Sequence, residues 1–302
     1  MIVANIFFGL NAPIAKHVLN SPQISALALT TMRMVGAAML FWIASFFIRK
    51  EEVEHKDMLR LFFAALFGVI CNQFLFIYGL NLTSPIDASI VCTTTPIITM
   101  IIAAIYLKEP ITSKKAGGIF VGAMGALLLI LSSKNLHSGG DSNIFGDFIC
   151  LLSSFSYSIY LVVFKNLTQK YSAITLLKWM FLYASICYIP FSYHELNGIE
   201  WNAIDNNTLM GIGYVVIVAT FLAYICIPIG QRLLRPTILS MYGYVQPIVS
   251  ATLSVILGLD TFGYIKIIAI ILVFLGVYLV NKSKSKAQLD AEKAEKNLSA
   301  DY

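Results

Sequence analysis

Residues 84–133 read SPIDASIVCTTTPIITMIIAAIYLKEPITSKKAGGIFVGAMGALLLILSS, and a second version at residues 235–284 reads RPTILSMYGYVQPIVSATLSVILGLDTFGYIKIIAIILVFLGVYLVNKSK. A shift of 151 positions aligns the two copies without a gap. The aligned pairs are Pro85 with Pro236, Ser89 with Ser240, Pro96 with Pro247, Glu109 with Asp260, Lys115 with Lys266 and Gly125 with Gly276. A repeat of about half the chain length is too long for a solenoid and indicates a duplicated half-protein.

Composition indicates a membrane protein. Hydrophobic residues make up 58% of the 302 and charged residues only 12%, with a mean hydropathy of +0.78, whereas soluble domains carry about 25% charged residues. A chain this apolar cannot cover itself with polar side chains in water, so we expect an integral membrane protein. The formal net charge of +5 comes from short loops and the tail. It therefore indicates orientation in the membrane and argues against nucleic acid as a partner.

Ten apolar runs are separated by short polar breaks. They cover residues 2–19, 25–48, 60–81, 86–107, 115–132, 145–165, 173–193, 209–230, 236–257 and 263–281. Each run can cross about 30 Å of hydrocarbon as a helix, whereas strands of a membrane barrel have about ten residues of alternating polarity. The sequence therefore predicts an all-α integral membrane fold with ten transmembrane helices.

Lysine and arginine residues are concentrated in alternate loops. The loops after the second, fourth, sixth, eighth and tenth runs are basic, so we expect them to face the cytoplasm, with both termini inside. Each half has five spans, an odd number, so equivalent loops emerge on opposite sides of the membrane. We predict two inverted repeats, 1–134 and 135–284, followed by a charged cytoplasmic tail, 285–302. This arrangement lets a central site open alternately to either side.

Several motifs then point to a family. They are FGLNAPIAK at 8–16, Arg33, PIDAS followed by TTTPIIT, the KEPIT turn with its following glycines, and YSIYLVVFK at 157–165. With these motifs the chain resembles the EamA family of the drug/metabolite transporter superfamily along essentially its whole length. It departs from the family pattern at Phe8, where Trp is common, and at Leu259 and Thr261, which flank Asp260 where Glu-Pro is usual. The resemblance implies two five-helix repeats and metabolite transport, often export, through a cavity lined by both repeats. It implies no single substrate.

Arg33 is the most informative single residue. It lies about nine residues into the second run, where a buried arginine costs about 3 kcal/mol on insertion scales. No Asp or Glu occupies the middle of any span. Arg33 must therefore face an anionic ligand, water or protein carbonyls, and the sequence leaves a ligand or gating contact and a structural role equally open. The missing carboxylate also favours facilitated transport or exchange over proton coupling.

Pro96 and Pro247 interrupt equivalent runs in the two halves, and such paired breaks point to a transporter site. Threonines precede the first proline, and tyrosines with a glutamine precede the second; packing and repair of the broken backbone are the alternatives for each. Asn11 and Tyr160 occupy equivalent places when Lys16 is aligned with Lys165. The predicted substrate-binding residues are Asn11, Arg33, Thr94, Tyr160, Tyr242 and Gln246, with Pro96 and Pro247 as flexible points.

These observations predict an inner-membrane permease of a small metabolite, an amino acid or related compound, working by alternating access in the direction of export. A lipid or lipid-carrier translocase of the same fold is the alternative. A membrane-embedded enzyme is disfavoured, because the chain has no H-E-x-x-H, no G-x-S-x-G and no mid-span carboxylate pair, and so no predicted catalytic residues.

No cofactor or metal is expected, because the five cysteines lie in apolar runs without a C-x-x-C pair and the histidines do not cluster. The expected partners are the substrate and membrane lipid. Glycines at 117, 118, 122 and 125 suit close helix packing within the chain or a homodimer.

Overall fold

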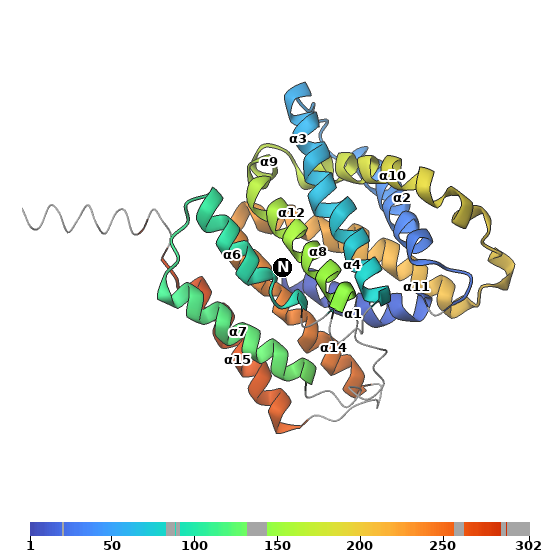
Figure 1. Cartoon of the computed structure of the whole chain (residues 1–302). Helices are drawn as coiled ribbons and strands as arrows, with labels where there is room; N and C mark the ends of the chain where they lie inside the picture. Colours follow the sequence, from blue (N-terminus) through green and yellow to red (C-terminus); the bar gives the residue numbers. More distant parts are fainter. Residues whose placement is uncertain are drawn as a thin grey trace, which may run out of the picture.

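A computed structural model describes residues 1–19, 21–82, 88, 91–131, 144–256, 263–284 and 288. Across these residues the chain is helical and has no strand (Figure 1). Seven helical segments of the described chain are long and apolar enough to span a membrane, and the apolar helix Thr95–Tyr106 is shorter. The chain is thus an all-helical, multi-pass membrane protein.

The first half of the chain forms seven described segments. They are α1 (Ile2–Leu19), α2 (Ala26–Ser45), α3 (His55–Ala65), η1 (Leu66–Ile70), α4 (Cys71–Leu82), α6 (Thr95–Tyr106) and α7 (Ser113–Leu131). The segments α3, η1 and α4 follow one another without a break and form one long span. The predicted run 86–107 is described as α6 together with residues 88 and 91–94.

The second half repeats this order. Its segments are α8 (Ile144–Val163), α9 (Lys165–Lys170), α10 (Ala173–Asn197), η3 (Trp201–Ala203), α11 (Asn206–Val216), η4 (Ile217–Leu222), α12 (Ala223–Leu233), α13 (Pro236–Met241), η5 (Tyr242–Tyr244), α14 (Val245–Ile256) and α15 (Tyr264–Asn281). Both η1 and η4 are π-helical turns, and their first residues, Leu66 and Ile217, are related by the shift of 151. The duplication therefore extends to a local irregularity that the apolar pattern does not reveal.

The helices pack in pairs that the two repeats relate. The contact of α4 with α8 matches that of α12 with α1, and the contact of α6 with α8 matches that of α14 with α1. Two further contacts join equivalent helices directly, α2 with α10 and α7 with α15. This is the packing expected when two inverted five-helix repeats face each other across an approximate two-fold axis.

Helices α7 and α15 lie side by side at the edge of the bundle (Figure 1). Glycines allow their backbones to meet: a Cβ on Gly276 would lie 2.5 Å from the Gly122 nitrogen, and one on Gly125 would lie 2.7 Å from the Ala269 oxygen. The predicted small-residue face of α7 is therefore used for packing within the chain.

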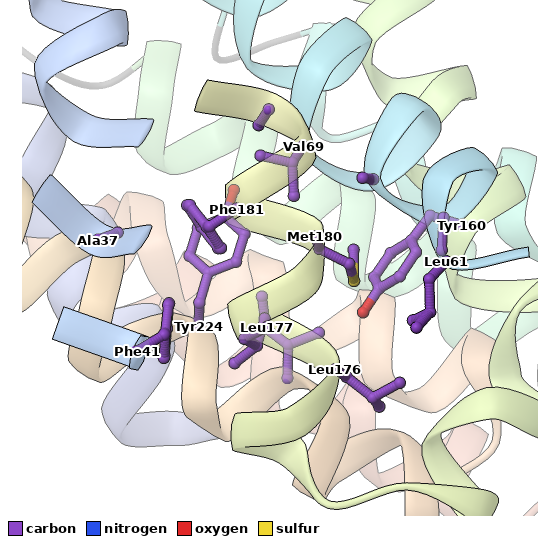
Figure 2. Packing of buried hydrophobic residues seen from close by; sticks show 14 of the residues in the cluster. Ala37, Phe41, Leu61, Val69, Tyr160, Leu176, Leu177, Met180, Phe181 and Tyr224 are labelled. Carbon is purple, nitrogen blue, oxygen red and sulfur yellow. The ribbon is translucent and has the colours of Figure 1, made fainter. Parts of the chain in front are cut away.

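Large apolar side chains cover the outside of the bundle. Phe47 and Ile144 are 85% and 84% exposed, as expected for side chains that face lipid instead of water. The largest buried cluster instead lies among α2, α3, α8, α10 and α12 (Figure 2). Predictions on Pro85, Ser89, Leu259, Asp260, Thr261 and the tail beyond 284, apart from residue 288, fall outside the described residues.

Candidate substrate site

Arg33 lies in the middle of α2 and is only 2% exposed. Its Nε donates a hydrogen bond of 3.0 Å to Oγ1 of Thr220, on the π-helical turn η4. The same hydroxyl donates its own proton to the carbonyl of Val215 at 2.6 Å. The turn thus fixes the hydroxyl with its lone pair toward Arg33, because its only proton is already engaged.

Most of the hydrogen-bonding capacity of Arg33 is unused. A guanidinium carries five N–H donors, and only the Nε donor is engaged with another described residue. Every salt bridge among the described residues involves Arg60, Lys115 or Lys170 and none involves Arg33. The described part of the bundle therefore holds a buried cation without a counter-ion, which is costly unless a ligand or water completes it.

Aromatic rings from several helices pack around Tyr224, which interacts electrostatically with Arg33. The ring of Phe41 on α2 lies 5.2 Å from Phe181 and 4.8 Å from Phe221, centroid to centroid. Tyr224 on α12 lies 5.1 Å from Phe181 and 5.8 Å from Phe8 on α1. Figure 2 shows Phe181 and Tyr224 against each other, with Phe41 beside them. The rings keep the neighbourhood apolar and strengthen electrostatic contacts made within it.

Asn11 on α1 has a buried Oδ1 that accepts no hydrogen bond from the described residues. Its depth follows from its neighbours. Phe8 packs on Tyr224, and Ala15 belongs to the same cluster as Val215. Along α1, Asn11 lies between Phe8 and Ala15, and along the facing segment Thr220 lies between Val215 and Tyr224, the partners of those two residues. The free acceptor of Asn11 and the free donors of Arg33 are thus at the same depth in the bundle.

A chain of polar contacts leads away from Tyr224. Gln73 on α4 donates to the Tyr224 hydroxyl and, at 3.3 Å, to Oδ1 of Asn72. Asn72 donates to Oγ of Ser153 on α8 at 3.0 Å, and Ser153 donates back to the Asn72 carbonyl at 2.8 Å. These bonds link α4 of the first repeat to α8 and α12 of the second.

Sequence reasoning missed Thr220 and gave no weight to Gln73 paired with Tyr224. Gln73 and Tyr224 are related by the shift of 151, as are Thr93 and Tyr244, whose hydroxyl donates to the Thr93 carbonyl at 3.1 Å. In a two-fold arrangement, equivalent residues meet at the axis. A search of the sequence for polar residues 151 positions apart would therefore have found both contacts.

The other predicted binding residues have contacts of their own, away from the Arg33–Thr220 bond. Tyr160 donates to Gln231 at 3.2 Å, and Gln246 donates to Asn5 at 2.9 Å. The Thr94 hydroxyl donates at 2.6 Å to the carbonyl of Val91, three residues earlier in the same segment. Tyr242 packs, partly buried, on the cluster around Met241 and Tyr244. Among the described hydrogen bonds, none joins Thr94, Tyr160, Tyr242 or Gln246 to Arg33 or Asn11.

The helix breaks lie just before the two prolines. Residues 93–94 form a turn, and α6 begins at Thr95 with Pro96 in its first turn, where a missing N–H costs little. In the second half the 3₁₀ turn η5 precedes α14, which contains Pro247. The Tyr244 to Thr93 bond joins the two breaks. Their role as flexible points stays a prediction.

The described residues hold no group of three or more His, Cys, Asp or Glu that could bind a metal. The groups that the described residues do offer around Arg33 are a cation, an amide acceptor and aromatic rings.

Comparison with known proteins adds a family. The model described as the EamA-like transporter family matches residues 1–131 and 144–282. An uncharacterized transporter of Archaeoglobus fulgidus is 30% identical over 67% of this chain and 69% of its own. The uncharacterized transporter YetK of Bacillus subtilis is 21% identical over 88% of this chain and 82% of its own. A WAT1-related protein of Arabidopsis thaliana is 24% identical over 94% and 85%.

A solved crystal structure has the same fold. It matches 97% of this chain and 96% of its own length with a TM-score of 0.73, at 15% sequence identity. At that identity the match bears on the fold alone.

Proposed function

This chain belongs to the EamA-like transporter family, and from that premise we propose that it is a permease that exports a small metabolite, an amino acid or a related compound, across the inner membrane. It works by alternating access between its two inverted repeats. The observation that carries the proposal is Arg33, a buried cation that bonds to Thr220 and has no described counter-ion.

The chemistry of Arg33 favours a carboxylate. A guanidinium presents paired donors whose geometry matches the two oxygens of a carboxylate, and such charge-assisted bonds are strong in an apolar surround. The Nη donors of Arg33 are free of described partners, so a carboxylate would supply the missing negative charge. Asn11 offers a buried acceptor at the same depth, which an ammonium or amide N–H would satisfy. A small molecule with both groups completes the site.

The inverted repeats support the transport mechanism. Contacts of one repeat have equivalents in the other, so a state open to one side can be exchanged for its mirror state open to the other. Export is proposed because it is common in the family that the chain resembles. No Asp or Glu lies mid-span, so we propose facilitated transport or exchange in place of proton coupling.

A comparison of culture media tests the proposal. Cells that express the protein, cells with the empty vector and cells with Arg33→Ala are grown alike, and the compounds outside the cells are profiled. We expect one class of carboxylate-bearing amines to accumulate only with the intact protein. If the media are identical although the protein is shown to be inserted, export of a soluble metabolite is wrong. Activity that follows lipid headgroup composition would instead support lipid translocation.

A further inference from the structure

An ionic cluster closes one end of the bundle. Nζ of Lys170, the last residue of α9, lies 2.7 Å from Oδ2 of Asp57 and 2.7 Å from Oε1 of Glu54. The hydroxyl of Tyr171 donates to the same Asp57 oxygen at 2.8 Å. The Asp57 side chain is only 4% exposed, whereas that of Lys170 is 43% exposed. These four residues, Glu54, Asp57, Lys170 and Tyr171, are called the ionic cluster below.

The cluster joins the two repeats. Glu54 and Asp57 lie at the start of α3 in the first repeat, and Lys170 and Tyr171 lie at the end of α9 in the second. Further bonds hold the same segment: the Ser172 N–H donates to Glu51 at 2.9 Å, and Arg232 on α12 donates to the carbonyls of Thr168 and Tyr171. Arg60 lies at the edge, 3.5 Å from Asp57. These loops are the lysine- and arginine-rich ones predicted to face the cytoplasm.

A narrow apolar gap lies behind the cluster, and it is too tight to admit a water molecule. Leu61 and Ala64 on α3, Tyr160 on α8 and Leu167 on α9 are among the residues that line it. Leu61 is one helical turn beyond Asp57, so the gap begins where the cluster ends. The gap lies within the buried cluster of Figure 2, because Tyr160 on α8 and Met180 on α10 both line it and lie beside each other there.

The described residues at the opposite end of the bundle make different contacts. The shift of 151 relates Glu54 to Asp205 and Asp57 to Thr208. Asp205 caps α11 through the N–H groups of Asn207 and Thr208, at 3.0 and 3.1 Å, and binds no lysine among the described residues. The described residues there include an apolar cluster, with Val18, Ile24, Ile199 and Ile212 among its members, and a hydrogen bond from Ser25 to Glu195. Among the described residues, the ionic cluster therefore has no counterpart at the place that the repeat relates to it.

We propose that the ionic cluster is the inner gate of the transport path and that the apolar gap behind it is the inner segment of that path, closed in this structure. This inference rests on the proposed function. Opening moves α9, with Lys170 and Tyr171, away from α3. The separated charges regain water, so partly exposed ion pairs break and reform at little cost.

The gate stays charged at physiological pH. Hydrogen bonds to the carboxylates of Asp57 and Glu54 raise the pKa of Lys170 above its usual range. Hydrogen bonds from Lys170 and Tyr171 hold the pKa of Asp57 below its usual value. The pair of Lys170 with Asp57 is therefore present at neutral pH; it is lost as pH rises through the raised pKa of Lys170, or as pH falls through the lowered pKa of Asp57. The rate of gate opening should therefore not change between about pH 6 and 9, because even an ordinary lysine has a pKa near 10.4.

Thiol accessibility tests the gate without any substrate. A cysteine replaces Ala64, which is 1% exposed in the gap, and inside-out vesicles are treated with a membrane-impermeant maleimide. Lys170→Gln and Asp57→Ala are each combined with Ala64→Cys. The matched control is Glu195→Gln at the opposite end, and protein without the new cysteine reports labelling of native thiols.

We expect both gate variants to label Cys at position 64 at least about five-fold faster than the parent, whereas Glu195→Gln leaves the rate unchanged. Reversing the pair, Asp57→Lys with Lys170→Asp, should slow labelling again. If a variant fails to fold, high salt applied to the parent should speed labelling, because it screens exposed charge pairs. Equal rates in all variants, or a parent rate that ignores salt, would overturn the gate.

The readout also separates this inference from the proposed function. Transport by the parent with unchanged labelling in the gate variants defeats the gate alone. Faster labelling in a protein that moves no metabolite defeats the proposed function and leaves a gate to some other path.

Discussion

Two equivalent places in the molecule hold opposite chemistry. Helices α2 and α10 both begin after a serine whose hydroxyl accepts from the N–H three residues on, Ser25 from Ala28 and Ser172 from Thr175. With these caps aligned, Arg33 corresponds to Met180, and the shift of 151 relates Thr220 to Val69. The alignment also relates two packing contacts, Phe41 with Phe221 and Tyr188 with Ile70. Met180 and Val69 lie in the main apolar cluster (Figure 2).

The difference shows what the fold needs and what it does not. At Met180 and Val69 the fold fills this place with a thioether and an isopropyl group. A cation at Arg33 is therefore not a requirement of the architecture. A buried arginine costs about 3 kcal/mol or more in a membrane, and residues that cost stability in this way are characteristic of functional sites. Positions where the two repeats differ in chemistry, such as Arg33 and Met180, therefore locate the site better than positions where the repeats agree.

The strongest way to break the comparison is Arg33→Met, which gives the first half the chemistry of the second. We expect transport to fall by about 30-fold or more, since losing one partner of a buried charge pair costs about 2–5 kcal/mol. Thermal stability should rise or hold, because the uncompensated charge is gone. Transport in proteoliposomes and the melting temperature measure the two effects. A destabilised variant that still transports would mean that Arg33 is structural.

A second change makes η4 resemble its counterpart. Thr220→Val keeps the shape but removes the hydroxyl that accepts from Arg33 and donates to Val215. Transport should fall by about 10-fold or more, in keeping with the loss of one hydrogen bond to a charged group. The measurement is the concentration dependence of transport. Full activity in Thr220→Val would show that the bond does not position the guanidinium.

Much of the frame follows from sequence alone. The lengths of the apolar runs indicate the ten spans, and the match at a shift of 151 indicates the duplication. The isolated charge within an apolar run indicates the buried position of Arg33. The partner of Arg33 is not indicated, because Thr220 depends on a π turn and on which helix crosses α2. Thr94 and Gln246 looked equally plausible as ligands, yet their side chains bond to Val91 and Asn5. A sequence shows that a polar residue lies within an apolar span. It does not show which neighbouring helix the side chain faces, because that depends on how the helices pack.

Asn11 offers a smaller test. Asn11→Leu keeps a similar volume and removes the buried acceptor without a partner. We expect apparent affinity to fall about 3- to 10-fold, the effect of one lost hydrogen bond, with stability unchanged or higher. Competition between a substrate and its analogue without the amino group measures this. An equal loss for both compounds would remove Asn11 from the amino end of the site.

The smallest effect is expected on the apolar side. Met180→Leu conserves volume and should change stability by less than about 1.5 kcal/mol, with transport within about two-fold of the wild type. It is the matched control for Arg33→Met, since both substitutions fall at equivalent places on α2 and α10. A large transport defect in Met180→Leu would mean that both halves contact the substrate equally.

One measurement tests the central claim that Arg33 binds the carboxylate of the substrate. Proteoliposomes carrying wild type, Arg33→Met or Met180→Leu are loaded with an equimolar mixture of amino acids and the amines that lack their carboxyl groups, and release is followed by mass spectrometry. We predict that wild type and Met180→Leu release one class of amino acids and not the matching amines, and that Arg33→Met releases neither. Equal release of amino acids by Arg33→Met and wild type, or release of the amines as fast as the amino acids, would contradict the account.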